Sequence, residues 1–180
     1  MPTTVIGVHL SPQHTFTKQA QGVIELVAGE GVKGDAHAGA TVKHSYLKVK
    51  RADKPNLRQV HLIAIELIEE LRREGFNVER GSMGENITTS GVHLTSLPHG
   101  TRLVFASGAA IELTGIRTPC KQLNGFQDGL LDAVREKNEA GEFRRPVGVL
   151  GVVVASGIVA PQDAITVQLP TSSHRPMDFI

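Results

Sequence analysis

Cys120 is the only cysteine in this 180-residue chain, and its neighbours favour the thiolate form of its side chain. Arg117 and Lys121 place positive charge on both sides of the sulfur, which stabilises a thiolate. Thr118 is predicted to cap a single helical turn that begins at Pro119, so that Cys120 would lie among unpaired backbone N–H groups. A lone cysteine excludes an intrachain disulfide and every metal site built from several thiolates.

A thiolate in this setting has three chemical uses: it can carry a persulfide, bind a soft metal or attack an electrophile. The spacing of the residues does not choose among them. The plain alternative is that Cys120 is a small buried apolar residue, which is common for free cysteines. The predicted cap and the two cations favour a functional thiol. The eight histidines do not form the i, i+4 pair of a helical zinc site, so the sequence gives no support for a zinc centre built from histidines.

Two glycine-rich segments carry further polar residues. Residues 31–39 place three glycines around Asp35 and His37, as expected where the backbone turns sharply or approaches a ligand. Residues 81–87 carry Glu85 and Asn86, which could bind a polar ligand. Each segment has a simpler interpretation, a tight turn for the first and an irregular loop for the second.

Residues 41–59 form a basic stretch with six Lys or Arg residues and one acid. A solvated loop is the default interpretation. The sharper hypothesis is a lid that brings positive charge to an anionic ligand carrying phosphate. Arg58 is its best candidate, because it directly precedes an apolar run that should be ordered.

Composition predicts one globular domain over residues 1–180. Hydrophobic residues make up 40% of the chain and charged residues 21%. A net charge of +1 and the absence of Trp argue against binding to nucleic acid or to a membrane surface. The chain does not open with a secretory signal pattern, and its longest apolar stretch, residues 147–160, is too short to cross a bilayer. We expect a soluble, cytoplasmic protein.

The elements that must position these residues are mostly strands. Runs rich in Val, Ile and Thr predict strands at residues 3–10, 22–28, 102–106, 110–115, 147–155 and 164–169. The run at 147–155 lacks polar alternation, which predicts burial on both faces. One helix is predicted from Ala64 to Gly75, and a second from a cap at Asp128 to Gly141. The predicted fold is mainly β (α+β), a β-barrel or rolled sheet with a few covering helices.

The chain resembles the MOSC domain, a family named for the C-terminal domain of molybdenum-cofactor sulfurases. The resemblance rests on four segments in order: Gly31-Val-Lys-Gly-Asp-Ala-His37, Arg58-Gln-Val-His-Leu62, Gly84-Glu-Asn-Ile87 and Thr114-Gly-Ile-Arg-Thr-Pro-Cys-Lys-Gln-Leu123. It implies a barrel-like, mostly β fold and a stand-alone protein without the aminotransferase-like domain of the sulfurases. In this resemblance Cys120 either carries sulfur or binds molybdenum held by a pterin dithiolene.

The resemblance also implies a set of pocket residues. In it Cys120 and Arg117 take the catalytic positions, and Asp35, His37, Glu85 and Asn86 match the other pocket segments of the family. The positive charges of Arg58 and Lys121 would neutralise an anionic cofactor, which completes the expected cofactor-binding residues. One departure lies at residues 161–163, where related sequences have Gly-Asp and this chain has Pro-Gln-Asp. If Gln162 adopts a positive φ there, the cost is on the order of 1 kcal/mol.

The leading functional hypothesis is a protein that binds the molybdenum cofactor through Cys120 and supports reduction of N-hydroxylated compounds. Its electrons would come from an electron-transfer protein, because the chain shows no flavin, haem or iron–sulfur motif. The alternative is a sulfur carrier whose Cys120 persulfide comes from a cysteine desulfurase, with the pyridoxal phosphate held by that partner. A non-catalytic module for a small anion and a cysteine hydrolase complete the alternatives; for the hydrolase, His37 and His61 are available as bases.

Overall fold

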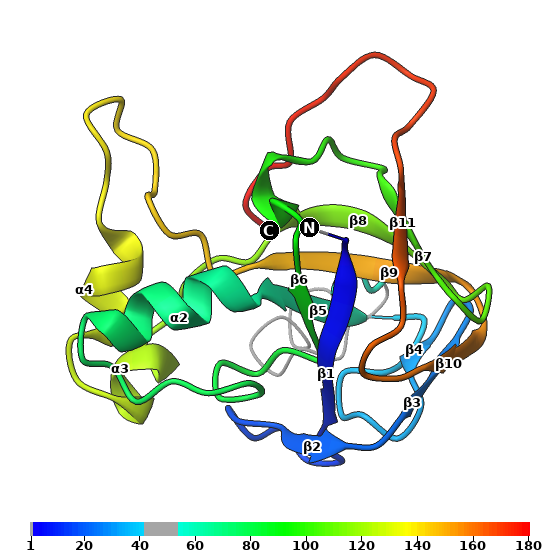
Figure 1. Ribbon diagram of the computed structural model, residues 1–180, viewed down its shortest axis with the longest axis horizontal. Coiled ribbons are helices and arrows are strands. Elements are labelled where there is room, and N and C mark those ends of the chain that lie inside the picture. Colours follow the sequence, from blue (N-terminus) through cyan, green and yellow to red (C-terminus); the bar gives the residue numbers. More distant parts are fainter. Residues whose placement is uncertain (1, 42–53) are drawn as a thin grey trace.

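The computed structural model describes residues 2–41 and 54–180, and strands dominate it (Figure 1). The strands are β1 (Thr4–Leu10), β2 (Gln19–Gln21), β3 (Ile24–Val27), β4 (Gly31–Val32), β5 (Val60–Ala64), β6 (Ile87–Ser90), β7 (Arg102–Phe105), β8 (Ala110–Ile116), β9 (Val149–Ala155), β10 (Gly157–Val159) and β11 (Ile165–Gln168). The helices are α2 (Ile65–Arg73), the 3-10 turn η1 (Leu94–Ser96), α3 (Gln122–Phe126) and α4 (Leu130–Arg135).

The strands form two sheets. The larger sheet has the order β11-β7-β8-β9-β5-β6-β1-β2, and the smaller one has the order β10-β3-β4. The β5–β6 pair is parallel, because helix α2 connects the two strands, and the other pairs are antiparallel. The larger sheet is rolled, so that Thr4 of β1 forms a bridge with Ala164 just before β11. The predicted mainly β class is therefore confirmed, as a rolled sheet rather than a continuously closed barrel.

All six predicted strands exist, with ends shifted by one or two residues. The prediction for β9 needs a correction, because only its first three residues are all buried. From Val152 onward burial alternates, and Val154 is 37% exposed. In the second half of β9, Val153 faces the core while Val154 faces solvent, so this half is buried on one face only. The strands β2, β4, β5, β6 and β10 were not predicted, and most of them are only two to four residues long.

The predicted first helix is confirmed as α2. Its inward residues Ile68 and Leu71 are fully buried, and Gly75 follows it with a φ of 94°. Ala64 is the exception: it has an extended backbone and ends β5 instead of joining the helix. Figure 1 shows α2, α3 and α4 gathered on one side of the sheets, where their apolar faces share a core separate from the one inside the rolled sheet.

The second helix and the turn at Cys120 differ from the prediction. The residue before α4 is Gly129, which has a left-handed backbone with a φ of 79°, so Gly129 and not Asp128 takes the cap position. The helix ends at Arg135, well before Gly141. Its predicted apolar residues are nevertheless buried. Thr118 does not cap a helix either, because its N–H and hydroxyl both donate to the carbonyl of Ile180. α3 begins at Gln122, and Cys120 precedes it.

The turn that departs from related sequences keeps the positive φ. Gln162 has a φ of 76°, and its N–H donates to the carbonyl of Val5 at 2.8 Å. The carboxylate of Asp163 accepts a hydrogen bond from the N–H of Ala160 and closes the turn. Among the helices within the described ranges, none is long and apolar enough to span a bilayer.

Candidate functional site

A cavity of about 560 Å³ opens beside Cys120, and it is lined mostly by residues of loops, with one residue each from strands β5 and β9. Its lining residues come from the β1–β2 loop, the segment after β4, β5 and the segment just before it, the loop before β6, the segment after β8, and β9. They are His14, Thr15, Phe16, Lys18, His37, Arg58, His61, Gly84, Asn86, Arg117, Thr118, Cys120, Lys121, Gln122 and Leu150. A volume of this size suits a small-molecule ligand or cofactor.

Cys120 lies in the cavity wall with its side chain partly exposed. Its thiol donates a weak hydrogen bond to Oε1 of Gln122 at 3.4 Å. Arg117 lies beside it, donates to the carbonyl of Met83 at 2.6 Å, and stacks over the Phe16 ring at 5.7 Å from the ring centre. These contacts fix the guanidinium next to the sulfur.

The charge in the cavity is positive. Burial lowers the pKa of Arg117; the negative charges of a Cys120 thiolate and of Glu85 oppose that shift, and nearby Arg58 adds to it. Lys121 also lines the cavity and is exposed. Two guanidinium groups that repel each other across a cavity favour an anion between them.

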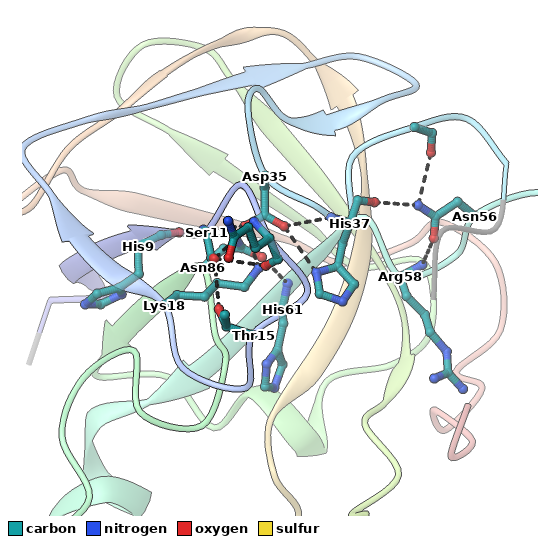
Figure 2. A network of polar contacts seen from close by, with 12 residues as sticks. His9, Ser11, Thr15, Lys18, Asp35, His37, Asn56, Arg58, His61 and Asn86 are labelled. Carbon is teal, nitrogen blue, oxygen red and sulfur yellow. Dashed lines mark hydrogen bonds and ion pairs between the residues drawn. The ribbon is translucent and has the colours of Figure 1, made fainter. Parts of the chain in front are cut away.

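Asp35 is the centre of a buried polar network behind the cavity wall (Figure 2). One carboxylate oxygen accepts from the backbone N–H and ring Nδ1 of His37, at 3.0 and 3.2 Å. The other accepts from the N–H of Ser11, from Nζ of Lys18 at 2.7 Å and from Nδ2 of Asn86 at 3.0 Å. Five donors on one carboxylate fix the positions of three different loops.

The ionisation of this network follows from its burial. Burial alone would raise the pKa of Asp35, but the hydrogen bond from His37 and the charge of Lys18 bring it far below its usual range. Burial lowers the pKa of Lys18, and the charge and hydrogen bond of Asp35 oppose that shift. The ion pair is kept because each charge has its partner at hydrogen-bond distance.

Asn86 links this network to the sheet. Its Oδ1 accepts from the N–H of His61, and its Nδ2 donates to the carbonyl of His9 as well as to Asp35. Figure 2 also shows Asn56, which donates to the carbonyl of His37 and accepts from the N–H of Arg58. The two amide side chains thus hold His37, His61 and Arg58 at the cavity.

The three histidines in the cavity wall make different contacts. Burial, followed by the charge of Arg117, lowers the pKa of His61 well below its ordinary value, so the ring is neutral, and its Nε2 donates to the carbonyl of Val147 at 2.8 Å. His37 is oriented by Asp35 through Nδ1, and its ring meets that of His14 edge to face at 5.0 Å. A carboxylate-oriented imidazole is a common proton carrier.

The glycine-rich segment 81–84 is needed for close backbone contact. A Cβ at Gly84 would lie 2.7 Å from the carbonyl of Phe16, and one at Gly81 would lie 2.6 Å from the carbonyl of Lys18. Both glycines have positive φ. They allow the β1–β2 loop to pack against this turn and to present Phe16 and Lys18 to the cavity.

The structure brings six of the eight predicted site residues to the cavity wall: Cys120, Arg117, Asn86, His37, Arg58 and Lys121. Asp35 and Glu85 lie behind it. Glu85 is fully buried, burial raises its pKa, and its Oε1 accepts from the N–H of Gly81. Both acids therefore support the wall from behind. Lys43, Lys48, Lys50 and Arg51 of the predicted basic lid lie outside the described residues.

Sequence reasoning missed Lys18, Phe16 and His14. They come from a loop without periodicity, and no local pattern separates them from other loop residues. His61 was considered only as a base for a hydrolase. The sequence offered one clue to His61, its place in the apolar run that follows Arg58. Side chains alternate between the two faces of a strand, so one of the residues next to each other in this run had to face the cavity.

Comparison with known proteins identifies the family, because the MOSC domain matches residues 33–166. The chain belongs to the MOSC domain family. YuaD from Bacillus subtilis (strain 168) is 30% identical over 123 residues, which cover 64% of this chain and 63% of YuaD. The match thus spans slightly less than two thirds of that relative.

Solved structures agree with this assignment. The crystal structure of Bacillus subtilis YuaD, with 27% identity, aligns with a TM-score of 0.76 over 95% of this chain and 98% of YuaD. YiiM from Escherichia coli aligns with a TM-score of 0.63 at 21% identity, over 97% of this chain and 73% of YiiM. YiiM from Geobacillus stearothermophilus aligns at 14% identity with a TM-score of 0.67. The two YiiM structures show that this chain has the same fold as they have.

Proposed function

We propose that the cavity binds the molybdenum cofactor, with the Cys120 thiolate as the protein ligand to the metal. The observation that carries the proposal is the combination of one sulfur ligand and several cations around a single cavity. The MOSC family is associated with this cofactor. Arg117, Arg58 and Lys121 would neutralise the phosphate of the cofactor.

The residues present fit a metal that arrives with most of its ligands. Within the described ranges, no group of three or more His, Cys, Asp or Glu side chains could hold a metal ion. A bare ion would therefore find too few ligands at Cys120. A metal already held by the two sulfurs of a pterin dithiolene needs little more than the one thiolate that the cavity offers. The cavity volume of about 560 Å³ is also sufficient for such a cofactor.

The proposed reaction is reduction of an N-hydroxylated small molecule. When bound, the cofactor supplies a redox-active metal that accepts electrons from an external electron-transfer protein. The N–O bond breaks, a pair of electrons and a pair of protons are consumed, and the oxygen leaves as water. His37, oriented by Asp35, is the residue that would give a proton to the leaving oxygen. Neutral His61 and cationic Arg117 would orient the substrate.

The test is the molybdenum content per chain after purification from a host that makes the cofactor. We expect near-stoichiometric metal in the natural chain and its loss in Cys120→Ala. Gln122→Ala is a matched control, because Gln122 lines the same cavity and contacts the sulfur but has no ligand role. Metal that stays bound in Cys120→Ala would refute the ligand role of Cys120.

The partial exposure of Cys120 supports a second candidate, sulfur transfer. The Cys120 thiolate would attack the terminal sulfur of a persulfide on a pyridoxal-phosphate cysteine desulfurase, and the cysteine of that enzyme would leave as a thiolate. The name of the relative YuaD places that protein among candidates for metal-sulfur cluster biosynthesis. A reducible sulfur adduct on Cys120 after incubation with a desulfurase and cysteine is the expected result, and an unmodified thiol would exclude this function.

The same proposal sets the partners. We infer a small-molecule substrate and a protein partner, either an electron-transfer protein or a cysteine desulfurase, in the cytoplasm. The near-zero net charge of +1 offers no general attraction to nucleic acid or to anionic lipids.

A further inference from the structure

Residues 178–180 pair with the strand that leads to Cys120. The N–H of Ile116 donates to the carbonyl of Asp178 at 2.8 Å, and the N–H of Ile180 donates to the carbonyl of Ile116 at 3.0 Å. This is a parallel bridge between Ile116 and Phe179. One step further, the N–H and hydroxyl of Thr118 both donate to the carbonyl of Ile180, at 3.3 and 3.1 Å. The pairing therefore continues to a residue of the cavity wall, two positions before Cys120.

Gly115 shows that this contact is close. A Cβ at Gly115 would lie 2.7 Å from Cγ1 and 2.9 Å from Cδ1 of Ile180, and 2.9 Å from the carbonyl oxygen of Asp178. Real Cβ atoms do not approach other atoms this closely, so any larger residue would push residues 178–180 away. The glycine in the Thr-Gly-Ile-Arg run thus serves the contact with residues 178–180.

Residues 175–179 are anchored at three further points. Met177 is buried in the core of the rolled sheet, and the carbonyl of Arg175 accepts from the N–H of His99 at 2.8 Å. The ring of Phe179 meets that of Phe143 edge to face at 5.1 Å. The segment is therefore fixed before it reaches Ile116 and can act as a support.

The opposite side of the Cys120 segment is held by different residues. The N–H of Arg117 donates to the carbonyl of Gly148 at 3.1 Å, and Nη2 of Arg135 in α4 donates to the carbonyl of Pro119 at 3.4 Å. Thr118 is thus hydrogen-bonded to residue 180, whereas its neighbours Arg117 and Pro119 are hydrogen-bonded to Gly148 and Arg135. Without residues 178–180, the strand would lose the support on one side at Ile116 and Thr118.

We propose that residues 178–180 are a positioning segment for Cys120, which hold its thiol at the cavity wall without contacting the ligand. This inference deepens the proposed function, since it concerns the same thiol, but it does not depend on which of the two chemistries the thiol performs. The segment acts through backbone pairing at Ile116 and Thr118. Loosening it moves Cys120 away from the cavity, while the buried network around Asp35 stays in place.

The first test replaces a single donor. Ile180→Pro removes the N–H that bonds to Ile116, and Ile180→Val keeps it as the matched control. Cys120 is the only cysteine, so its alkylation rate with iodoacetamide reports on this thiol alone. We expect Ile180→Pro to raise that rate roughly tenfold, because a released segment exposes the sulfur, and Ile180→Val to react like the natural chain.

The second test uses the close contact at Gly115. Gly115→Ala should also speed alkylation, and the double variant with Ile180→Ala should restore the natural rate in part, because two of the three clashing atoms are gone. Gly22→Ala is the control, since a Cβ there would meet nothing within 4 Å. Unchanged alkylation in both Ile180→Pro and Gly115→Ala would overturn the proposal. So would an equal rise in Gly22→Ala, which would indicate general loosening.

Molybdenum content separates this proposal from the proposed function. If the natural chain binds the metal, Ile180→Pro should lower the content per chain at least severalfold, and Ile180→Val should not. If the natural chain binds no metal, the cofactor proposal fails, but the alkylation rates still decide whether residues 178–180 position the thiol. Full metal content in Ile180→Pro despite faster alkylation would show that the ligand position does not depend on the segment, and would also overturn the inference.

Discussion

The two sides of the cavity are held together in different ways. On one side the Asp35 carboxylate, in the segment after β4, accepts five hydrogen bonds. Through Lys18 it binds the β1–β2 loop, and through Asn86 it binds the loop before β6. On the other side the thiol of Cys120 makes one weak hydrogen bond to Gln122, and backbone contacts at the preceding residues hold its segment.

This difference assigns different tasks to the two sides. A buried network in which each charge is paired is rigid, and it fixes the charge that a ligand meets. A thiol that binds a metal or transfers sulfur must instead be accessible to its ligand or partner. The Cys120 thiol makes few contacts that a ligand would have to break. We therefore expect substitutions on the Asp35 side to change the stability of the fold, and substitutions on the Cys120 side to change chemistry with little effect on stability.

Asp35→Ala is the variant with the largest expected effect. It would leave the ammonium of Lys18 buried without its partner, which costs on the order of 3–5 kcal/mol. Urea unfolding measures the loss, with Asp132→Ala as a control at an exposed carboxylate of α4. A loss in Asp35→Ala as small as in Asp132→Ala would contradict the view that Asp35 is the centre of the rigid side.

The pH dependence of stability is the second way to test that side. The backbone N–H and carbonyl of His9 are hydrogen-bonded to Asn86, which places the His9 ring beside the network. Burial of that ring, followed by the charges of Arg80 and Lys18, lowers its pKa from 6.5 to about 4. Because the folded pKa lies below the unfolded one, the stability from neutral His9 is complete above pH 6.5. It is lost as the pH falls toward 4, and the loss is about 3 kcal/mol.

The measurement compares unfolding free energies near neutral pH and near the folded pKa. His9→Gln should show a clearly smaller decrease between the two conditions than the natural chain. Some decrease should remain, because the pKa of His61 is also lowered by burial and acts in the same direction. An unchanged decrease in His9→Gln would assign the acid sensitivity to other groups.

The close loop contacts on this side give a third test, with a matched pair of glycines. Gly84 and Gly34 have nearly the same positive φ, 84° and 82°. A Cβ at Gly84 would meet the carbonyl of Phe16 at 2.7 Å, whereas one at Gly34 would meet nothing within 4 Å. Gly34→Ala should lower the free energy of unfolding by about 1 kcal/mol because of its positive φ alone, and Gly84→Ala should lower it clearly more because of the added clash. Equal losses would show that the Phe16 loop moves aside easily.

The two sides also differ in how far they could be predicted from the sequence. Cys120, Arg117 and Lys121 are neighbours in the chain, so their shared location followed from local spacing. His37, Arg58 and Asn86 stood out locally as candidates in separate segments, and the resemblance to the MOSC domain connected these segments to one site. The rest depended on contacts between distant residues, and local patterns carry little information about those.

Two particular residues show where local reasoning failed. Thr118 has the type and position of a helix cap, but the carbonyl of Ile180, 62 residues away, takes its hydroxyl, so the long-range contact replaced the local one. Lys18 shows no pattern at all in its loop, and its burial follows from a carboxylate 17 residues away together with the glycine turn at Gly81. The strand and helix periods, which are local, predicted the main elements of the fold.

Cys120→Ala is the variant with the smallest expected effect on stability. The sulfur contributes one weak hydrogen bond to the fold, and its side chain is partly exposed, so we expect a change within about 0.5 kcal/mol in the free energy of unfolding. The same variant should lose the metal or the sulfur adduct entirely. Urea unfolding of Cys120→Ala beside Asp35→Ala places both sides of the cavity on one scale. A loss of several kcal/mol in Cys120→Ala would mean that the thiol is a structural residue of the core, and the division between a rigid side and a chemical side would no longer hold.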